Sequence, residues 1–251
     1  MRFHRYLSII FSAAALSLAV APAITHASVV IGATRVIYEA ASGEKTVRLT
    51  NKSQAPSLVQ AWLDTGASQA ERSTLEVPFV VSPPMSRIDP GKSQTLRIMH
   101  SGEPLPPDRE SIFWLNVLDI PARPNAKNGE NFLQLSFRSR IKFFFRPAGL
   151  AGTAMQAPQQ LTWQLAGEGN RAVLRVSNPT PYHVSFAAVE LASGEKTLAV
   201  KDPAMVAPFE TRTLELPTTA MASTSMRVRY QFINDYGGIS SGEAALQEPV
   251  R

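Results

Sequence analysis

Cysteine is absent from the 251-residue chain. This absence excludes disulfide bonds, thiolate nucleophiles and cysteine-bound metals, so the stability of an exported form must come from its own hydrophobic cores. Histidine is scarce, and only His100 and His183 lie beyond the first 27 residues. Two histidines are too few for a convincing catalytic zinc site. We therefore expect no metal and no cofactor, and we expect both histidines to be ordinary surface or loop residues.

Long hydrophobic runs are also few. The most pronounced one, Leu7–Val20, follows two arginines and precedes a stretch of small residues. It is too short to span a membrane, and the pattern is typical of a secretory signal peptide over residues 1–27. We expect cleavage after Ala27, although Ala23 ends a second small-residue site. No comparable run follows, so the remaining 224 residues (251 minus 27) are expected to be exported and to contain no membrane span.

The net charge of the chain is also small. The formal net charge is +5, and removing the two leader arginines leaves +3, a mild excess that names no partner by itself. Gly238–Gly242 (GISSG) matches the G-x-S-x-G pattern of a nucleophile elbow, but no histidine follows Ser240 to complete a triad. We interpret these glycines as turn residues and expect no enzymatic activity.

Proline and glycine, by contrast, are plentiful, with 19 and 14 residues. They separate many short apolar runs, which is typical of an all-β protein. A turn is expected at Asp89–Lys92, where proline fixes φ and glycine accepts the left-handed conformation. Residues 28–148 hold about seven runs, which fit an immunoglobulin-like sandwich. The expected strands are Val29–Tyr38, Lys45–Thr50, Leu58–Leu63, Phe79–Val81, Thr95–Met99, Ile112–Ile120 and a long stretch considered below.

A second series of apolar runs follows the stretch Arg146–Gln160, which is rich in Pro, Gly, Ala and Gln and is interpreted as the interdomain connection. Turn-rich clusters such as Asn178–Pro181 separate these runs. They predict a second, smaller β-sandwich over residues 149–251. The expected strands are Leu161–Leu165, Ala172–Val176, His183–Leu191, Thr211–Leu216 and Met226–Ile233.

One stretch, Glu130–Pro147 (ENFLQLSFRSRIKFFFRP), combines length, period-two alternation and positive charge more densely than any other. Its odd positions are mostly apolar and its even positions mostly polar or basic, which predicts an unusually long strand. Three readings are open. It could be a core strand with a basic solvent face, a working edge strand, or a basic and aromatic track for single-stranded nucleic acid. Export and the modest net charge argue against nucleic acid as a partner.

Seven short motifs, in this order, give the chain a family resemblance. They are Ala33–Val36 (ATRV), Gln60–Trp62 (QAW), Pro83–Gly91 (PPMSRIDPG), Asp108–Phe113 (DRESIF), Ile141–Pro147 (IKFFFRP), Asn178–Tyr182 (NPTPY) and Ile233–Gly238 (INDYGG). Over these motifs the chain resembles the PapD-like periplasmic chaperones of chaperone-usher pili. The resemblance implies an L-shaped pair of immunoglobulin-like domains in the periplasm. The short loop Pro121–Glu130 and the missing cysteines resemble the branch of the family with a short F1–G1 loop.

The resemblance also implies a function and its residues. Arg35 and Lys142 would hold the C-terminal carboxylate of a pilus subunit in the cleft between the domains, where charge-assisted hydrogen bonds are strong. Leu133, Leu135 and Phe137 would be donor side chains that fill a groove in a subunit lacking its own final strand. The subunit would then be delivered to an outer-membrane usher. Whether the free protein self-associates through the donor strand is left open.

Three further residues match family positions that form a charged contact between the domains, namely Glu110, Arg146 and Asp235. One geometric difficulty concerns the long strand, because Lys142 has even parity and the donor residues have odd parity. Twist or a bulge is expected to intervene. The alternative from another class is an exported two-domain adhesin or ligand-binding module that binds through its loops.

Overall fold

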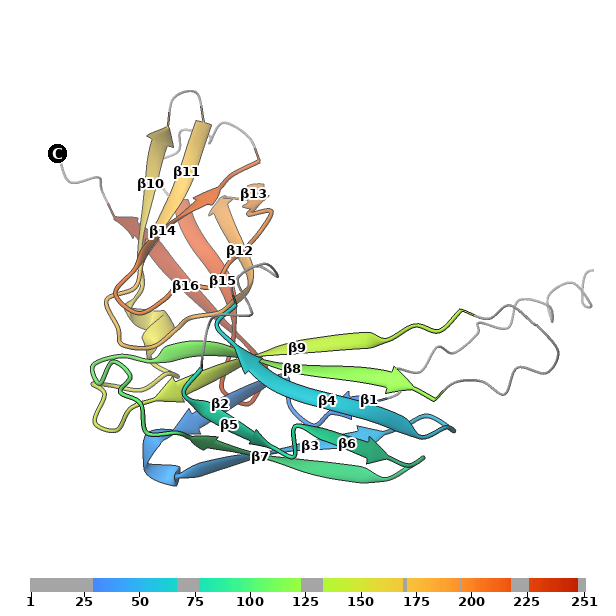
Figure 1. Ribbon diagram of the computed structural model, residues 1–251. Helices are drawn as coiled ribbons and strands as arrows, with labels where there is room; N and C mark the ends of the chain where they lie inside the picture. Colours follow the sequence, from blue (N-terminus) through green and yellow to red (C-terminus); the bar gives the residue numbers. More distant parts are fainter. Residues whose placement is uncertain are drawn as a thin grey trace, which may run out of the picture.

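The computed structural model describes residues 29–66, 77–122, 133–168, 171–194, 196–217 and 226–247. These residues form strands and two short 3-10 helices, η1 (Ala40–Ser42) and η3 (Ala157–Gln160). Figure 1 shows two β-domains that meet in an L shape, as expected. The expected signal peptide lies outside the described residues. Among those that are described, no helix has the length and apolar character needed to cross a membrane.

The first domain consists of two packed sheets. One has the strand order β1-β3-β7-β5 and the other β2-β9-β8-β4-β6. The strands are β1 (Val29–Ile31), β2 (Arg35–Glu39), β3 (Glu44–Asn51), β4 (Ser57–Asp64), β5 (Phe79–Ser82), β6 (Met85–Ile88), β7 (Ser93–His100), β8 (Ser111–Pro121) and β9 (Phe137–Arg146). Short β6 is absent from the sequence prediction, because Pro83 and Pro84 before it and Asp89–Gly91 after it indicate only turns.

The first expected strand is divided in the structure. β1 pairs with β3 in one sheet, whereas β2 pairs in parallel with β9 in the other. Gly32 lies at the crossing, and its N–H donates to the Arg48 carbonyl at 2.8 Å. The chain therefore changes sheets within a run that looks continuous in sequence, and this change brings Arg35 beside β9.

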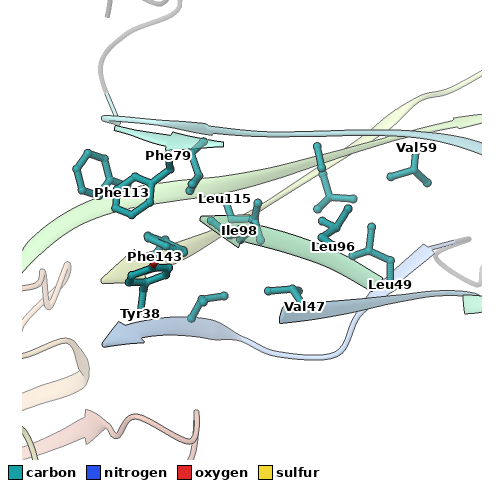
Figure 2. Close-up of a cluster of buried hydrophobic side chains, with 14 of the residues drawn as sticks. Tyr38, Val47, Leu49, Val59, Phe79, Leu96, Ile98, Phe113, Leu115 and Phe143 are labelled. Carbon is teal, nitrogen blue, oxygen red and sulfur yellow. The ribbon is translucent and has the colours of Figure 1, made fainter. Parts of the chain in front are cut away.

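Alternating inward residues of both sheets fill the space between them (Figure 2). Tyr38, Phe79 and Phe143 form an aromatic cluster, with centroids of Tyr38 and Phe79 5.6 Å apart and those of Phe79 and Phe143 5.0 Å apart. The Tyr38 hydroxyl donates to the Gly43 carbonyl at 2.7 Å, which satisfies its polar end. This core holds the C-terminal half of β9 firmly in the first domain.

The second domain is a sandwich whose strands form one continuous hydrogen-bonded series, β13-β12-β15-β16-β10-β11-β14. The only parallel pair in this described series is β10–β16, which joins the two layers at Trp163 and Leu246. The strands are β10 (Thr162–Glu168), β11 (Arg171–Ser177), β12 (Phe186–Ser193), β13 (Lys196–Ala199), β14 (Thr211–Glu215), β15 (Met226–Ile233) and β16 (Ile239–Gln247).

Strand β16 corrects the expectation that the glycines of the GISSG motif are turn residues. Gly238 does belong to the turn before β16, where its N–H donates to Asn234 Oδ1 at 3.0 Å, but Gly242 lies within β16 opposite Tyr230. A Cβ at this position would overlap the Tyr230 ring. Gly242 is therefore needed because the buried ring of Tyr230 covers its inward side. Ser240 lies inside strand β16, whereas a nucleophile elbow is a turn between a strand and a helix.

Candidate functional site

The junction of the two domains brings Arg35 and Lys142 together. They are direct register partners in the parallel pair β2–β9, so their side chains project from neighbouring strands on one face of the sheet. This face is turned towards the second domain, because Arg35 Nη1 donates to the Ile233 carbonyl at 2.8 Å and Lys142 Nζ donates to Ser185 Oγ at 2.9 Å. The structure thus places two cations side by side between the domains.

Both cations are partly buried, and burial disfavours their charged forms. Burial and the neighbouring Arg35 charge lower the pKa of Lys142 to about 8. Burial also lowers the pKa of Arg35, opposed by the negative charges of Asp235 and Glu110. Arg35 Nε is buried and has no hydrogen-bond partner among the described residues. Two partly desolvated cations side by side are suited to binding an anion.

Glu110, Arg146 and Asp235 also come together, as the sequence implies. Arg146 donates to Glu110 Oε1 and to Asp235 Oδ2, both at 2.8 Å. Burial by itself would lower the pKa of Arg146, but the hydrogen bond to Asp235 and the charge of Glu110 raise it above its ordinary value. Since Glu110 and Arg146 belong to the first domain and Asp235 to the second, this group connects the two.

His183 lies in a loop, which agrees with the expectation of a surface or loop residue, but its side chain is buried, with only 4% exposed. Its backbone N–H donates to Glu110 Oε2 at 2.8 Å, and its Nδ1 lies 3.2 Å from the same oxygen. The ring also packs on Phe144, with centroids 5.3 Å apart. Phe144 interrupts the polar even positions of β9, and this break in the alternation is the signal that an interface covers that face.

His100 was also expected on the surface or in a loop, but it is the last residue of strand β7 and is partly buried. Its ring packs on Phe79 and Phe145, with centroids 5.2 and 5.0 Å away. Its Nε2 atom is buried without a hydrogen-bond partner among the described residues. The reason is its position at the end of β7, where an aromatic core reaches the edge of the sandwich. No group of three or more possible metal ligands occurs within the described ranges.

The expected donor residues are exposed, with Leu133 82%, Leu135 54% and Phe137 56% accessible. The expected strand is shorter than the stretch Glu130–Pro147, because β9 begins at Phe137, opposite Asp119 near the end of β8. Residues 133–136 precede it without strand pairing, and residues 130–132 lie outside the described part of the chain. The pairing between the two strands stops at Phe137, although β8 itself continues to Pro121.

One edge of β9 is open along half its length. β8 pairs with all of Phe137–Phe145, whereas β2 pairs only with Lys142–Arg146. In the part of the chain that the structure describes, no strand pairs with the other edge of residues 137–141. In Figure 1 this half of β9 extends along β8, away from the second domain. Its backbone groups on that edge can accept another strand.

The parity difficulty is resolved without a bulge. The register of β9 with β8 is continuous, so odd and even residues stay on opposite faces throughout. Phe137 is on the same face as core residues Phe143 and Phe145, and Lys142 is on the face directed to the second domain. Donor side chains and cations therefore contact different surfaces of one strand, and no register shift is needed.

The outer face of β9 carries a polar cluster that sequence reasoning missed. Asp64 accepts hydrogen bonds from Arg140 at 2.7 Å and from Arg138 at 3.2 Å. Arg138 and Arg140 also stack on Trp62 and Trp114. Because both arginines are engaged with a carboxylate and an indole, the arrangement does not resemble an open track for nucleic acid. The sequence did contain one signal of this cluster, because Asp64 places a carboxylate at the end of β4, a strand whose alternate residues are apolar.

Comparison with known proteins gives a consistent result for both domains. Residues 28–151 match the family model "Pili and flagellar-assembly chaperone, PapD N-terminal domain". Residues 156–244 match "Pili assembly chaperone PapD, C-terminal domain". The chain is 44% identical to the chaperone protein FimB/FhaD of Bordetella pertussis, over 98% of this chain and 99% of that protein.

Solved structures agree with the sequence relatives. The crystal structure of the YadV chaperone is similar with a TM-score of 0.75 and 42% identity, covering 87% of this chain and all of that one. YadV of Escherichia coli K12 is described as a probable fimbrial chaperone. The SafB chaperone of Salmonella enterica, solved in complex with the SafA pilin, is similar with a TM-score of 0.72 and 31% identity, covering 89% of this chain and 99% of the matched chain.

Proposed function

Because the chain belongs to the PapD family of pilus-assembly chaperones, we propose that it captures pilus subunits in the periplasm and caps them by lending β9 as a strand. Its relatives are fimbrial chaperones, which favours a chaperone over the adhesin considered from the sequence. The family is one of chaperones and not of enzymes. Its proposed partners are pilus subunits and an outer-membrane usher. The proposed boundary between the two domains lies between residues 148 and 149.

The first step is the anchoring of the subunit's C-terminal carboxylate. Arg35 and Lys142 offer donors from adjacent strands, and a carboxylate between them would offset the repulsion of two like charges. The geometry supports this role because both cations lie side by side between the domains, where each donates a hydrogen bond to the second domain. Anchoring one end of the subunit's last segment fixes its register against β9.

The second step is the addition of β9 to the incomplete subunit. The open edge at residues 137–141 supplies backbone groups, and Leu133, Leu135 and Phe137 supply apolar side chains. Burying these three side chains contributes about 1.5 to 3 kcal/mol each. Association costs about 4 to 15 kcal/mol, so these side chains alone hardly suffice. Main-chain hydrogen bonds, each worth about 0.5 to 1.5 kcal/mol, supply the remainder when the subunit core closes around the strand.

A single observation carries this proposal. The most exposed apolar row described in the first domain leads directly into a strand with an open edge, and the same strand carries Lys142 further along. An isolated soluble protein would be expected to cover such an edge, because it invites aggregation. Donation of the strand to a subunit requires an exposed apolar row beside an open edge, whereas an adhesin that binds through its loops does not require either feature.

The direct test is reconstitution with a pilin that lacks its own last strand. The wild-type chain is expected to form a one-to-one complex with it after dilution from denaturant. Arg35→Ala and Lys142→Ala are expected to remain folded but to yield little complex. Arg87→Ala is the control, because Arg87 lies on β6, the far edge of the same sheet, and forms an exposed ion pair with Asp89. Undiminished yields from both cleft variants would refute the anchoring step.

A further inference from the structure

The outer face of the β4–β8–β9 layer contains a tightly bonded polar cluster around Asp64, whose side chain is 11% exposed. Its carboxylate accepts hydrogen bonds from Arg140 at 2.7 Å, from Arg138 at 3.2 Å and from Asn116 Nδ2 at 2.9 Å. Asn116, which is fully buried, also accepts a bond from Arg138 Nε at 2.9 Å. The cluster thus connects three neighbouring strands by side chains alone.

Two indole rings complete the cluster. The Arg138 guanidinium lies 5.1 Å from the Trp62 ring centroid, and that of Arg140 lies 4.4 Å from the Trp114 centroid. Gly66 closes the far side, where its N–H donates to Asp64 Oδ1 at 2.9 Å. A Cβ on Gly66 would lie 2.7 Å from Trp114 Nε1, so the turn packs directly on the indole. Cation-π contacts of this kind orient a guanidinium as well as stabilise it.

The position of the cluster matches the part of β9 that has the least other support. Residues 137–141 pair with β8 on one edge only, and Phe137 on their inward face is exposed. The hydrophobic core therefore holds the C-terminal half of β9 and reaches Ile141, but Phe137 lies outside it. Arg138 and Arg140 are the even residues of that N-terminal half, and both are bound to Asp64 on β4, two strands away.

We propose that Asp64 is a positioning residue which, through Arg138 and Arg140, keeps the open half of β9 extended and in register before a subunit arrives. This inference rests on the proposed function, because it assigns the cluster a role in strand lending. Ordering a strand in advance removes that cost from the binding step. The cluster is on the face opposite Phe137, so it can hold the strand without covering the donor side chains. It therefore raises the affinity through a faster association rate and leaves the dissociation rate of the finished complex nearly unchanged.

The test compares Asp64→Asn with Glu44→Gln, a matched control that removes a carboxylate from an exposed ion pair with Arg97 in the other sheet. Segment-resolved hydrogen exchange of the free proteins is the first measurement. In Asp64→Asn, exchange of residues 137–141 is expected to rise about tenfold, with no change in the core strands β3 and β7. Arg140→Gln is expected to reproduce this local effect and serves as the second variant if Asp64→Asn unfolds.

Association and dissociation rates with the incomplete pilin are the second measurement. Asp64→Asn is expected to lower the association rate about tenfold and to change the dissociation rate little, because the subunit itself holds β9 once it is bound. Asp64→Glu is expected to restore part of the association rate. If the wild-type chain captures pilin, two results would overturn this inference alone. One is unchanged exchange of residues 137–141 in Asp64→Asn, and the other is an association rate of Asp64→Asn equal to that of the wild-type chain. Failure of the wild-type chain to capture pilin at all would instead overturn the proposed function.

Discussion

Lys142 is a residue whose charge changes in the mildly alkaline range. Its pKa is about 8 in the folded chain, against an ordinary value of 10.5, because of burial first and the Arg35 charge second. Between these values the unfolded chain binds more protons at this residue than the folded chain does. The contribution of Lys142 to folding stability therefore rises with pH over about 8 to 10.5, whereas carboxylate binding requires the protonated amine.

We expect subunit affinity to be full below pH 8 and to fall above it by up to about tenfold per pH unit, since the ammonium must then be reprotonated on binding. The measurement is the dissociation constant for the incomplete pilin at several values from pH 6.5 to 9.5. Lys142→Arg is the control, because a guanidinium stays charged over this range. A flat profile for the wild-type chain, or the same slope in both proteins, would contradict the anchoring role of Lys142.

Strand β9 divides into two halves with different physical support. Its C-terminal half lies between β2 and β8 and contributes Phe143 and Phe145 to the core. Its N-terminal half has one paired edge, an exposed inward face and the Asp64 cluster behind it. This division lets one strand be a fixed part of the chaperone and, at the other end, a surface for another protein.

Alanine substitution of Leu133, Leu135 or Phe137 should separate folding from binding. Because these side chains are exposed, the free energy of unfolding is expected to change by less than about 0.5 kcal/mol. Pilin binding is expected to weaken by about 1.5 to 3 kcal/mol for each side chain buried in the complex. Urea unfolding and titration with pilin measure the two quantities. Val80→Ala, another exposed apolar position, is the control, and a loss of binding in Val80→Ala equal to that in Phe137→Ala would argue against a dedicated donor row.

At the scale of the whole molecule, the relative position of the domains depends on the charged group at their junction. Glu110 is 2% exposed and receives Arg146 and the His183 N–H, while Arg146 also bonds Asp235 across the interface. The Glu110 N–H in turn donates to the Pro181 carbonyl at 2.9 Å. These bonds help to keep Arg35 and Lys142 between the two domains.

Arg146→Ala should therefore affect both stability and shape. It leaves the buried Glu110 carboxylate without its cation, which is expected to cost about 3 to 5 kcal/mol in the free energy of unfolding. Arg227→Ala removes an exposed ion pair with Glu243 and is expected to cost about 1 kcal/mol or less. Urea unfolding gives the energies, and small-angle scattering reports whether the domain angle widens. Equal destabilisation by the two variants would mean that the junction is not held by this group.

Much of the architecture follows from period-two alternation and turn residues, which depend on local chemistry. The turn at Asp89–Lys92 is confirmed, with Gly91 at a φ of 69°. The start of β9 could not be predicted, because the alternation continues through Leu133 and Leu135 whereas pairing with β8 stops at Phe137. The burial of His183 and the cluster around Asp64 were missed for a related reason, since each arises where strands far apart in sequence meet. The assigned roles of Arg35, Lys142 and the donor residues stay predictions.

The central claim is that β9 is lent to a subunit along its open edge, and hydrogen exchange of the chaperone–pilin complex tests it most directly. We predict that backbone amides within residues 133–141 become strongly protected on pilin binding, while those of β3 and β7 change little. Protection confined to loops of either domain, with residues 133–141 exchanging as fast as in the free chain, would contradict the account.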